Sequence, residues 1–310
     1  MKKRLALLSA TVLSLGLQQA QGELLVGISL FGEVLTFDSA APSVIVNGRG
    51  TFVSGLTGQA QGEAISAIDY RPATGTLYAL GNAPGGTSGL YRLYTLNIAT
   101  GVASRVGNTD YNTFTGTFFG FDFNPVVDRI RVVNDGENNA RLHPDTGALA
   151  ASDPAINPAG ELVAVAYDRN DNNAATATTL FGIDSGANTL VRIGGPDGDP
   201  SPNGGAVTTI GPLGVDSTGR VSFDISSTSG LAYAGLSFTD AQNTTTSSLY
   251  TINLLTGGAT LLGPIGDGSI ALRALSVQII PEPGSLGLLA TVGGLLVGCM
   301  RGRKSARAVA

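Results

Sequence analysis

The feature that most constrains the fold is an internal repeat of about fifty residues, in which four strand-length segments follow in the same order. In residues 64–108 these segments read AISAIDYRP, GTLYALG, GLYRLYTLNIATG and VASRVGN, each rich in β-branched or aromatic residues. Corresponding units begin at Phe118, Glu161 and Arg220. Because no window shows a sustained helical period, the sequence predicts an all-β domain made of four-stranded units.

A fifth unit is divided between the two ends of the repeat region. ELLVGISL, GEVLTFDS and SVIVNGRGTFV, within residues 23–53, match the second, third and fourth segments, and the missing first segment is ALRALSVQ at residues 271–278. A blade completed by both ends closes a ring and removes exposed strand edges. We therefore predict a five-bladed β-propeller. A six-bladed or irregular propeller is the alternative, and an open solenoid is disfavoured because stacked repeats usually need polar caps.

Glycine recurs in the turn after the third segment of three units, at Gly101, Gly147 and Gly257. Glycine supplies the positive φ of a tight turn, and a preceding Thr or Asp can hydrogen-bond the turn backbone. We interpret these residues as structural.

The N-terminus has the features of a secretory signal peptide. A basic start, Lys2 to Arg4, precedes an apolar run from Leu5 to Leu17, and the small residues Ala20 and Gly22 occupy the positions that signal peptidase inspects. The pattern predicts a signal peptide over residues 1–22, with cleavage after Gly22. A short first helix of the fold is the alternative.

The C-terminus combines a short motif, an apolar segment and a basic cluster. They are formed by Pro281, Glu282 and Pro283, by residues 285–300, and by Arg301, Arg303 and Lys304. As a helix the apolar segment would span about 24 Å, which is short of a ~30 Å hydrocarbon core. Alone it would be a marginal membrane anchor.

This arrangement resembles the PEP-CTERM sorting signal of Gram-negative bacteria. The resemblance implies tethering at the inner membrane in transit, transient insertion of the C-terminal helix, and recognition by a membrane-embedded exosortase. It also implies removal of residues 281–310 and delivery to the cell envelope, outer surface or extracellular matrix. The chain continues from Ser305 to Ala310, where many such tails stop at the basic cluster, so processing stays open. A plain single-span anchor is the alternative.

The predicted propeller domain, residues 23–280, is strongly acidic. It contains 22 acidic residues, 11 arginines and no lysine, a formal charge of −11. Such a surface repels phosphate backbones, which argues against nucleic acid as a partner. The single cysteine, Cys299, lies in the predicted tail, so the domain has neither a disulfide nor a thiol nucleophile.

Carboxylates are the main candidates for chemistry in this domain. Asp69, Asp122 and Asp224 occupy matching positions in the first segments of three units, and Ala166 and Ser276 take that position in the other two. Because the first strand of a propeller blade lines the central channel, these acids could converge on an axial cation such as calcium. Alternatively, each fixes its own blade by bonding backbone amides near the strand end, which is the interpretation we favour.

Other polar and aromatic residues carry weaker signals. The single histidine, His143, excludes a multi-histidine metal site, and we expect it to decorate a solvent-facing turn. We interpret the Asp- and Asn-rich segments 134–139, 168–173 and 195–199 as solvated turns. Six aromatic residues could stack on sugars, but we expect them to pack between blades. They are Tyr70, Tyr91, Tyr94, Tyr111, Phe114 and Phe118.

The phrases IDYRPATGTLYALG and FGFDFNPVVDRIRVVNDGENNARLHPDTGAL resemble an uncharacterised bacterial exported family, domain of unknown function 4394. The likeness extends over most of residues 24–278, and the family implies no activity. We therefore predict an exported, non-catalytic module that binds a glycan or surface protein, or serves as a structural matrix component. The alternative is a calcium-dependent hydrolase or lyase with a site at the channel mouth.

Overall fold

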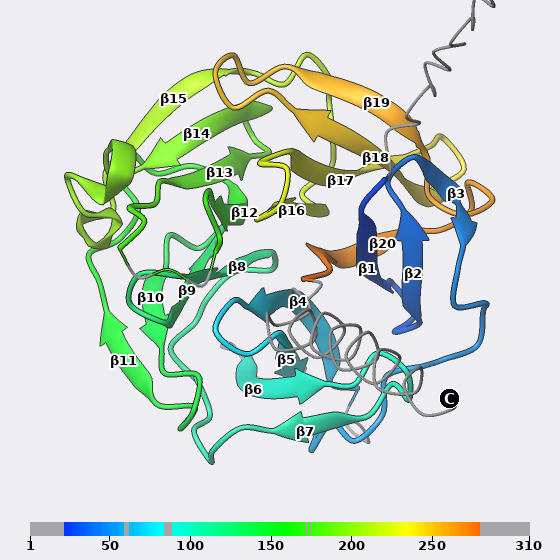
Figure 1. Cartoon of the computed structure of the whole chain (residues 1–310), viewed down its shortest axis with the longest axis horizontal. Coiled ribbons are helices and arrows are strands. Elements are labelled where there is room, and N and C mark those ends of the chain that lie inside the picture. The colour runs from blue at the N-terminus through cyan, green and yellow to red at the C-terminus, as the bar shows by residue number, and fades with distance from the viewer. Residues whose placement is uncertain (1–21, 59–61, 84–88, 172, 174, 280–310) are drawn as a thin grey trace, which may run out of the picture.

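The chain folds into a five-bladed β-propeller, as predicted (Figure 1). The computed structural model describes residues 22–58, 62–83, 89–171, 173 and 175–279. In this part of the chain, twenty strands form five antiparallel four-stranded sheets, which are arranged in a ring around a central axis. We number these sheets blades I to V.

The strands of each blade follow from the channel outward. Blade I contains β4 (Ala64–Arg71), β5 (Thr76–Ala83), β6 (Leu90–Leu96) and β7 (Ala103–Arg105). Blade II contains β8 (Phe119–Asn124), β9 (Arg129–Asn134), β10 (Asn139–Leu142) and β11 (Leu149–Ser152). Blade III contains β12 (Leu162–Tyr167), β13 (Leu180–Asp184), β14 (Thr189–Ile193) and β15 (Val207–Pro212), with two short 3-10 turns, η2 (Pro196–Gly198) and η3 (Pro202–Gly204), before β15.

The last two blades complete the ring. Blade IV contains β16 (Val221–Ile225), β17 (Ala232–Thr239), β18 (Thr245–Ile252) and β19 (Ala259–Pro264). Blade V contains β20 (Leu272–Val277), β1 (Leu24–Ser29), β2 (Val34–Asp38) and β3 (Ala41–Ile45). Within the described residues, no helix has both the length and the apolar character needed to cross a membrane.

Blade V is shared by segments from opposite ends of the repeat region, as the divided unit predicts. β1 pairs antiparallel with β20, and Leu25 lies opposite Val277 in the register. Backbone hydrogen bonds continue the pairing past both strands, from Gln278 N to Leu24 O and from Leu30 N to Ala271 O, each at 2.8 Å. Because β1 and β20 are hydrogen-bonded along their length, the first and last strands leave no gap in the ring.

The fourth strand of blade V is shorter than the segment that the sequence suggested. The pattern indicated residues 43–53, but β3 ends at Ile45. Gly48 and Gly50 adopt φ values of +71° and +102°, which a continuing strand does not accommodate. The chain then returns to blade V at Phe52, which forms an isolated bridge with Glu33.

Apolar residues gather in clusters between neighbouring blades. Phe181 of blade III packs with Phe223 and Tyr250 of blade IV in one cluster. Tyr91 of blade I packs with Phe119 of blade II in another, with ring centroids 4.5 Å apart. Of the six aromatic residues considered for sugar stacking, five are buried in such clusters and Phe118 is partly buried. The faces of the blades therefore supply the hydrophobic core.

Candidate functional site

The first strands of the blades line the channel and bring three acids together. Asp69 in β4, Asp122 in β8 and Asp224 in β16 each lie near the C-terminal end of their strand. One carboxylate oxygen from each lies within 4.8 Å of the others. Their exposed fractions are 1%, 1% and 3%. We call these three residues the axial acids.

Each axial acid bonds the backbone of the next blade around the ring. Asp69 Oδ2 accepts from Phe123 N at 2.8 Å, and Asp122 Oδ1 accepts from Tyr167 N at 2.9 Å. In the same way, Asp224 Oδ2 accepts from Val277 N at 2.6 Å.

Bonds within the acid's own strand also form, from Tyr70 N to Asp69 and from Ile225 N to Asp224. The expectation that each acid fixes only its own blade is therefore incomplete. Where inner strands converge on the axis, a short Asp side chain reaches the next strand, so the axial acids connect blades.

The two units without an aspartate are joined differently. Ser276 of blade V places its hydroxyl 2.8 Å from Asp224 Oδ2 and 3.1 Å from Asp69 Oδ1, which links blades IV, V and I. Ala166 of blade III is fully buried in the apolar cluster shared with blade IV. Hydrophobic packing therefore takes the place of an acid–amide bond at that junction.

Burial dominates the electrostatics of the axial acids. It raises the pKa of Asp69 well above its ordinary value, and the charge of Asp224 raises it further. Burial is also the main cause of the raised pKa of Asp122, followed by the charges of Asp69 and Asp224. For Asp224 burial outweighs the amide of Val277 and the Ser276 hydroxyl, and the pKa rises to about 6. The cluster therefore favours a proton or another positive charge.

The opposite mouth of the channel is basic. Arg220 and Arg273 line a small cavity near the N-terminal ends of the inner strands. Arg273 donates to Leu30 O at 3.0 Å, and burial, followed by the charge of Arg220, lowers its pKa. Arg220 lies over the ring of Phe118 at 5.6 Å from the centroid. The channel thus has an acidic and a basic end.

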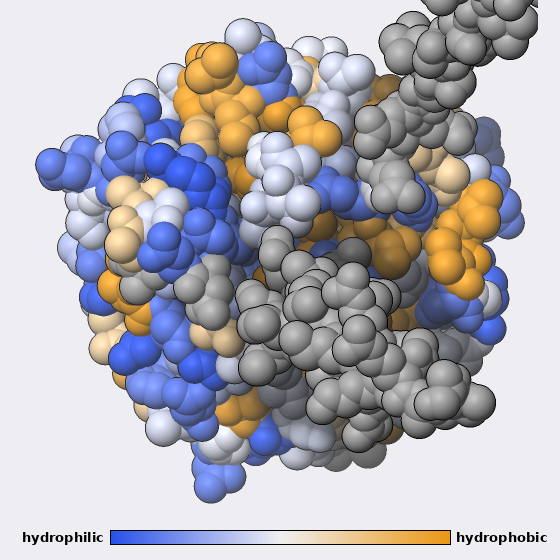
Figure 2. Space-filling model, viewed as in Figure 1, coloured by the Kyte–Doolittle hydropathy of each residue, from blue (hydrophilic) through white to orange (hydrophobic). Residues whose placement is uncertain are grey.

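A larger cavity of about 240 Å³ opens between blades II and III. Its polar lining includes Arg129, Arg131, Arg141, Tyr167, Ser201 and Asn203, and we call it the arginine cavity. Figure 2 shows hydrophilic residues gathered over this side of the propeller, at the left of the view. This cavity was not predicted from the sequence. The available signal was that three of the eleven arginines of an acidic domain fall within residues 129–141.

The three arginines of this cavity differ in their partners. Arg131 and Arg141 both pair with Asp153, at 2.7 Å and 2.8 Å. Arg129 donates to the backbone carbonyls of Val127 and Asp128, and it forms no ion pair with any described residue. Because Arg131 and Arg141 share one carboxylate and Arg129 has none, the three guanidiniums carry more positive charge than their ion-pair partners neutralise.

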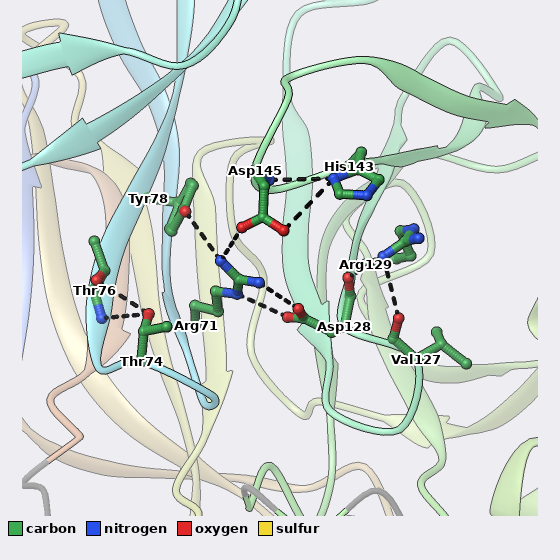
Figure 3. A network of polar contacts seen from close by, with 9 residues as sticks. All are labelled: Arg71, Thr74, Thr76, Tyr78, Val127, Asp128, Arg129, His143 and Asp145. Carbon is green, nitrogen blue, oxygen red and sulfur yellow. Dashed lines mark hydrogen bonds and ion pairs between the residues drawn. The ribbon is translucent and has the colours of Figure 1, made fainter.

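A polar network beside this cavity joins blades I and II (Figure 3). Arg71, at the end of β4, makes ion pairs with Asp128 and Asp145, which come from two turns of blade II. His143 lies in the same turn as Asp145, where its Nδ1 accepts from Asp145 N at 3.2 Å. The His143 side chain is 31% exposed, so it lies partly in solvent while it accepts a hydrogen bond within its own turn.

Several sequence-predicted sites lie outside the described residues. Of the signal-cleavage residues, Ala20 is outside and Gly22 is the first residue described. The sorting-signal residues also fall outside, namely Pro281, Glu282, Pro283, Arg301, Arg303 and Lys304.

Five blades that close through their terminal strands, around buried acids, define this protein as a β-propeller. Its sequence matches the family described as Domain of unknown function (DUF4394) over residues 33–276, and the chain belongs to that family. A comparison with curated proteins found no match.

Proposed function

We propose that the protein is an exported, non-catalytic binding module of the cell envelope or extracellular matrix. Residues 1–22 direct export, and residues 281–310 direct sorting by an exosortase, through the features given above. Signal peptidase and exosortase are its partners in transit. The folded propeller then carries out binding in its final location.

The observation that carries the non-catalytic proposal is the confinement of the axial acids. Each bonds backbone amides of the blades, and the spaces beside the channel strands have volumes of only about 10 Å³ and 20 Å³. A hydrolase needs its acid and base within hydrogen-bond reach of a substrate. Because a space of this size holds about one water molecule, a sugar ring or peptide does not reach these carboxylates.

The arginine cavity is the part of the surface that best fits ligand binding. A guanidinium pairs well with a carboxylate, and Arg129 is the cavity's arginine without an ion-pair partner among the described residues. Tyr167, Ser201 and Asn203 add polar groups or an aromatic edge beside it. The three arginines outnumber the two acids beside them, Asp153 and Asp197, so the cavity is locally positive although the domain as a whole is acidic. We therefore propose that it takes a carboxylate-bearing sugar unit of an acidic polysaccharide.

A binding experiment tests this assignment. The domain of residues 23–279 is titrated with a polyuronate and, separately, with a neutral dextran of similar length. We expect binding to the polyuronate alone, and Arg129→Gln should weaken it about tenfold to a hundredfold, since a charge-assisted hydrogen bond contributes about 1.5–3 kcal/mol. Arg192→Gln is the matched control, because Arg192 donates to Gly194 O outside the cavity lining.

Equal binding of both polymers, or equal loss in the two variants, would overturn the acidic-glycan assignment. Capture of a surface protein with no glycan binding would point to the protein partner instead. Export and sorting have a separate readout in the intact mass of the secreted protein. A chain from Glu23 that ends near Pro281 is expected, and a retained tail would contradict removal by an exosortase.

A further inference from the structure

The axial acids place three carboxylates together without a basic partner. One oxygen from each lies within 4.8 Å of the others, and all three residues are almost fully buried. Among the described residues, none of the three forms an ion pair, and their hydrogen bonds come from backbone amides and Ser276. Burial of neighbouring like charges is unfavourable unless a positive charge compensates them. We propose that this cluster is a calcium site that locks the blades together at the axis.

An observation on a separate loop also points to a ligand there. Asn170, in the loop after β12, is only 4% exposed, and its Oδ1 has no hydrogen-bond partner. With Asp69 and Asp224 it lines a cavity of about 10 Å³. A buried amide oxygen without a partner is costly, and it is also a good calcium ligand. A cation beside the acids would satisfy it.

The hydroxyl of Ser276 also favours a bound cation, because its single proton cannot serve both of the carboxylates beside it. A serine hydroxyl carries one proton, yet Ser276 Oγ faces a carboxylate oxygen of Asp224 at 2.8 Å and one of Asp69 at 3.1 Å. If it donates to the nearer oxygen, its lone pairs face the other carboxylate. A cation that both Oγ and that carboxylate coordinate removes this repulsion.

The kind of oxygens and their burial favour calcium over magnesium. Calcium accepts about six to eight oxygen ligands, including carboxylates and amide carbonyls, in flexible geometry, whereas magnesium keeps several of its waters and is rarely held by an all-protein cage. The carboxylate oxygens lie within 4.8 Å of one another, close enough to share one calcium ion, and the cavity of about 10 Å³ leaves little room for the several waters that magnesium retains. The axial acids and Ser276 offer carboxylate and hydroxyl oxygens, Asn170 offers an amide oxygen at the cavity that Asp69 and Asp224 line, and bidentate carboxylates or a water molecule would complete the shell.

The direct test is metal analysis of the secreted wild-type protein, followed by thermal unfolding in EDTA and in rising calcium concentration. We expect about one calcium per chain and a melting temperature that rises with calcium, because an ion bound only to the folded state stabilises it by mass action. Magnesium at the same concentrations should raise the melting temperature less.

Two variants separate calcium binding from simple hydrogen bonding. The triple variant Asp69→Asn, Asp122→Asn, Asp224→Asn keeps one acceptor oxygen at each position but removes the charges, so its melting temperature should no longer respond to calcium. Asn170→Ala leaves the acids intact and should weaken calcium binding about tenfold or more. Asp240→Asn, in the turn after β17, is the control and should respond as the wild type does.

The proposal fails if the wild-type protein holds no calcium and its melting temperature is the same in EDTA and calcium. That result would mean that protons, and not a bound cation, neutralise the cluster. The metal analysis decides the matter even if the triple variant does not fold. None of these readouts depends on glycan binding at the arginine cavity.

Discussion

Repeated single residues have roles that depend on contacts between blades. The glycines of the recurring turn, Gly101, Gly147 and Gly257, have φ values of +72°, +64° and +84°. The threonine before each one accepts a hydrogen bond from the amide two residues further on, at 3.3 Å. A Cβ on Gly147 would lie 2.2 Å from Val106 O of blade I. The glycine is therefore required by the neighbouring blade as well as by its own turn.

Substitution of Gly147 by alanine tests this double requirement. Gly230→Ala is the matched control, because Gly230 also has a positive φ, +70°, but an added Cβ there would meet open space. The control should lower the free energy of unfolding by about 1–2 kcal/mol through backbone strain alone. Gly147→Ala should cost about 1–3 kcal/mol more through steric overlap. Urea unfolding measures both, and equal losses would show that the contact with Val106 is unimportant.

Strands and turns are joined across blades by charged side chains as well as by apolar faces. Arg71 reaches from the end of β4 to Asp128 and Asp145 in two turns of blade II. The Arg71 side chain is 11% exposed, whereas those of Asp128 and Asp145 are 36% and 58% exposed. The hydrogen bond from Arg71 holds the pKa of Asp145 below its ordinary value. Because both carboxylates are partly solvated, water screens this connection, and we expect it to contribute less to stability than a fully buried ion pair.

Replacement of Arg71 by glutamine should lower the free energy of unfolding by about 1–2 kcal/mol at pH 7, less than for a fully buried pair because water screens both carboxylates. A lowered folded-state pKa gives stability that is present above the unfolded pKa and lost as pH falls through the folded value. The difference between wild type and variant should therefore shrink below about pH 4, since the ordinary value for Asp145 is 3.8. Urea unfolding across pH measures it, and a constant difference would contradict the ion-pair account.

The whole ring depends on its last strand. β20 supplies the channel strand of blade V, the amide of Val277 that Asp224 binds, and the hydroxyl of Ser276. Without it β1 would become an exposed edge, and the apolar faces beside blades I and IV would be uncovered. Closure therefore couples the stability of every blade to residues far apart in the sequence.

Two truncated chains that begin at Glu23 test the importance of closure. A chain that stops after Ser269 lacks β20 and should aggregate or lose its cooperative thermal transition. A chain that stops after Ile279 retains β20 and should unfold cooperatively as a monomer or stable oligomer. Size-exclusion chromatography and circular dichroism measure these outcomes. Cooperative folding of the shorter chain would show that blade V does not need its channel strand.

The sequence by itself determined the blade count, the shared closing blade and the three acidic positions. The sequence repeat reveals these features, because each blade has the same alternation of apolar and polar residues, the same turn residues and the same position of its first strand. Side chains alternate between the two faces of a strand, so Asp122 lies on the opposite face from Phe121 and Phe123. This alternation can be predicted without knowing how the adjacent blades pack. The early end of β3 was not predicted from the sequence, because it depends on the positive φ values that Gly48 and Gly50 adopt in the structure.

Only the tertiary structure decided what those positions do. Which amide an axial acid binds depends on how one blade is rotated against the next, and the approach of Asn170 to the same point depends on the path of a loop. The arginine cavity likewise needs side chains of blade II and turns of blade III to meet. Repeats specify blades because their signals are local, whereas sites between blades arise from distances that no single repeat contains.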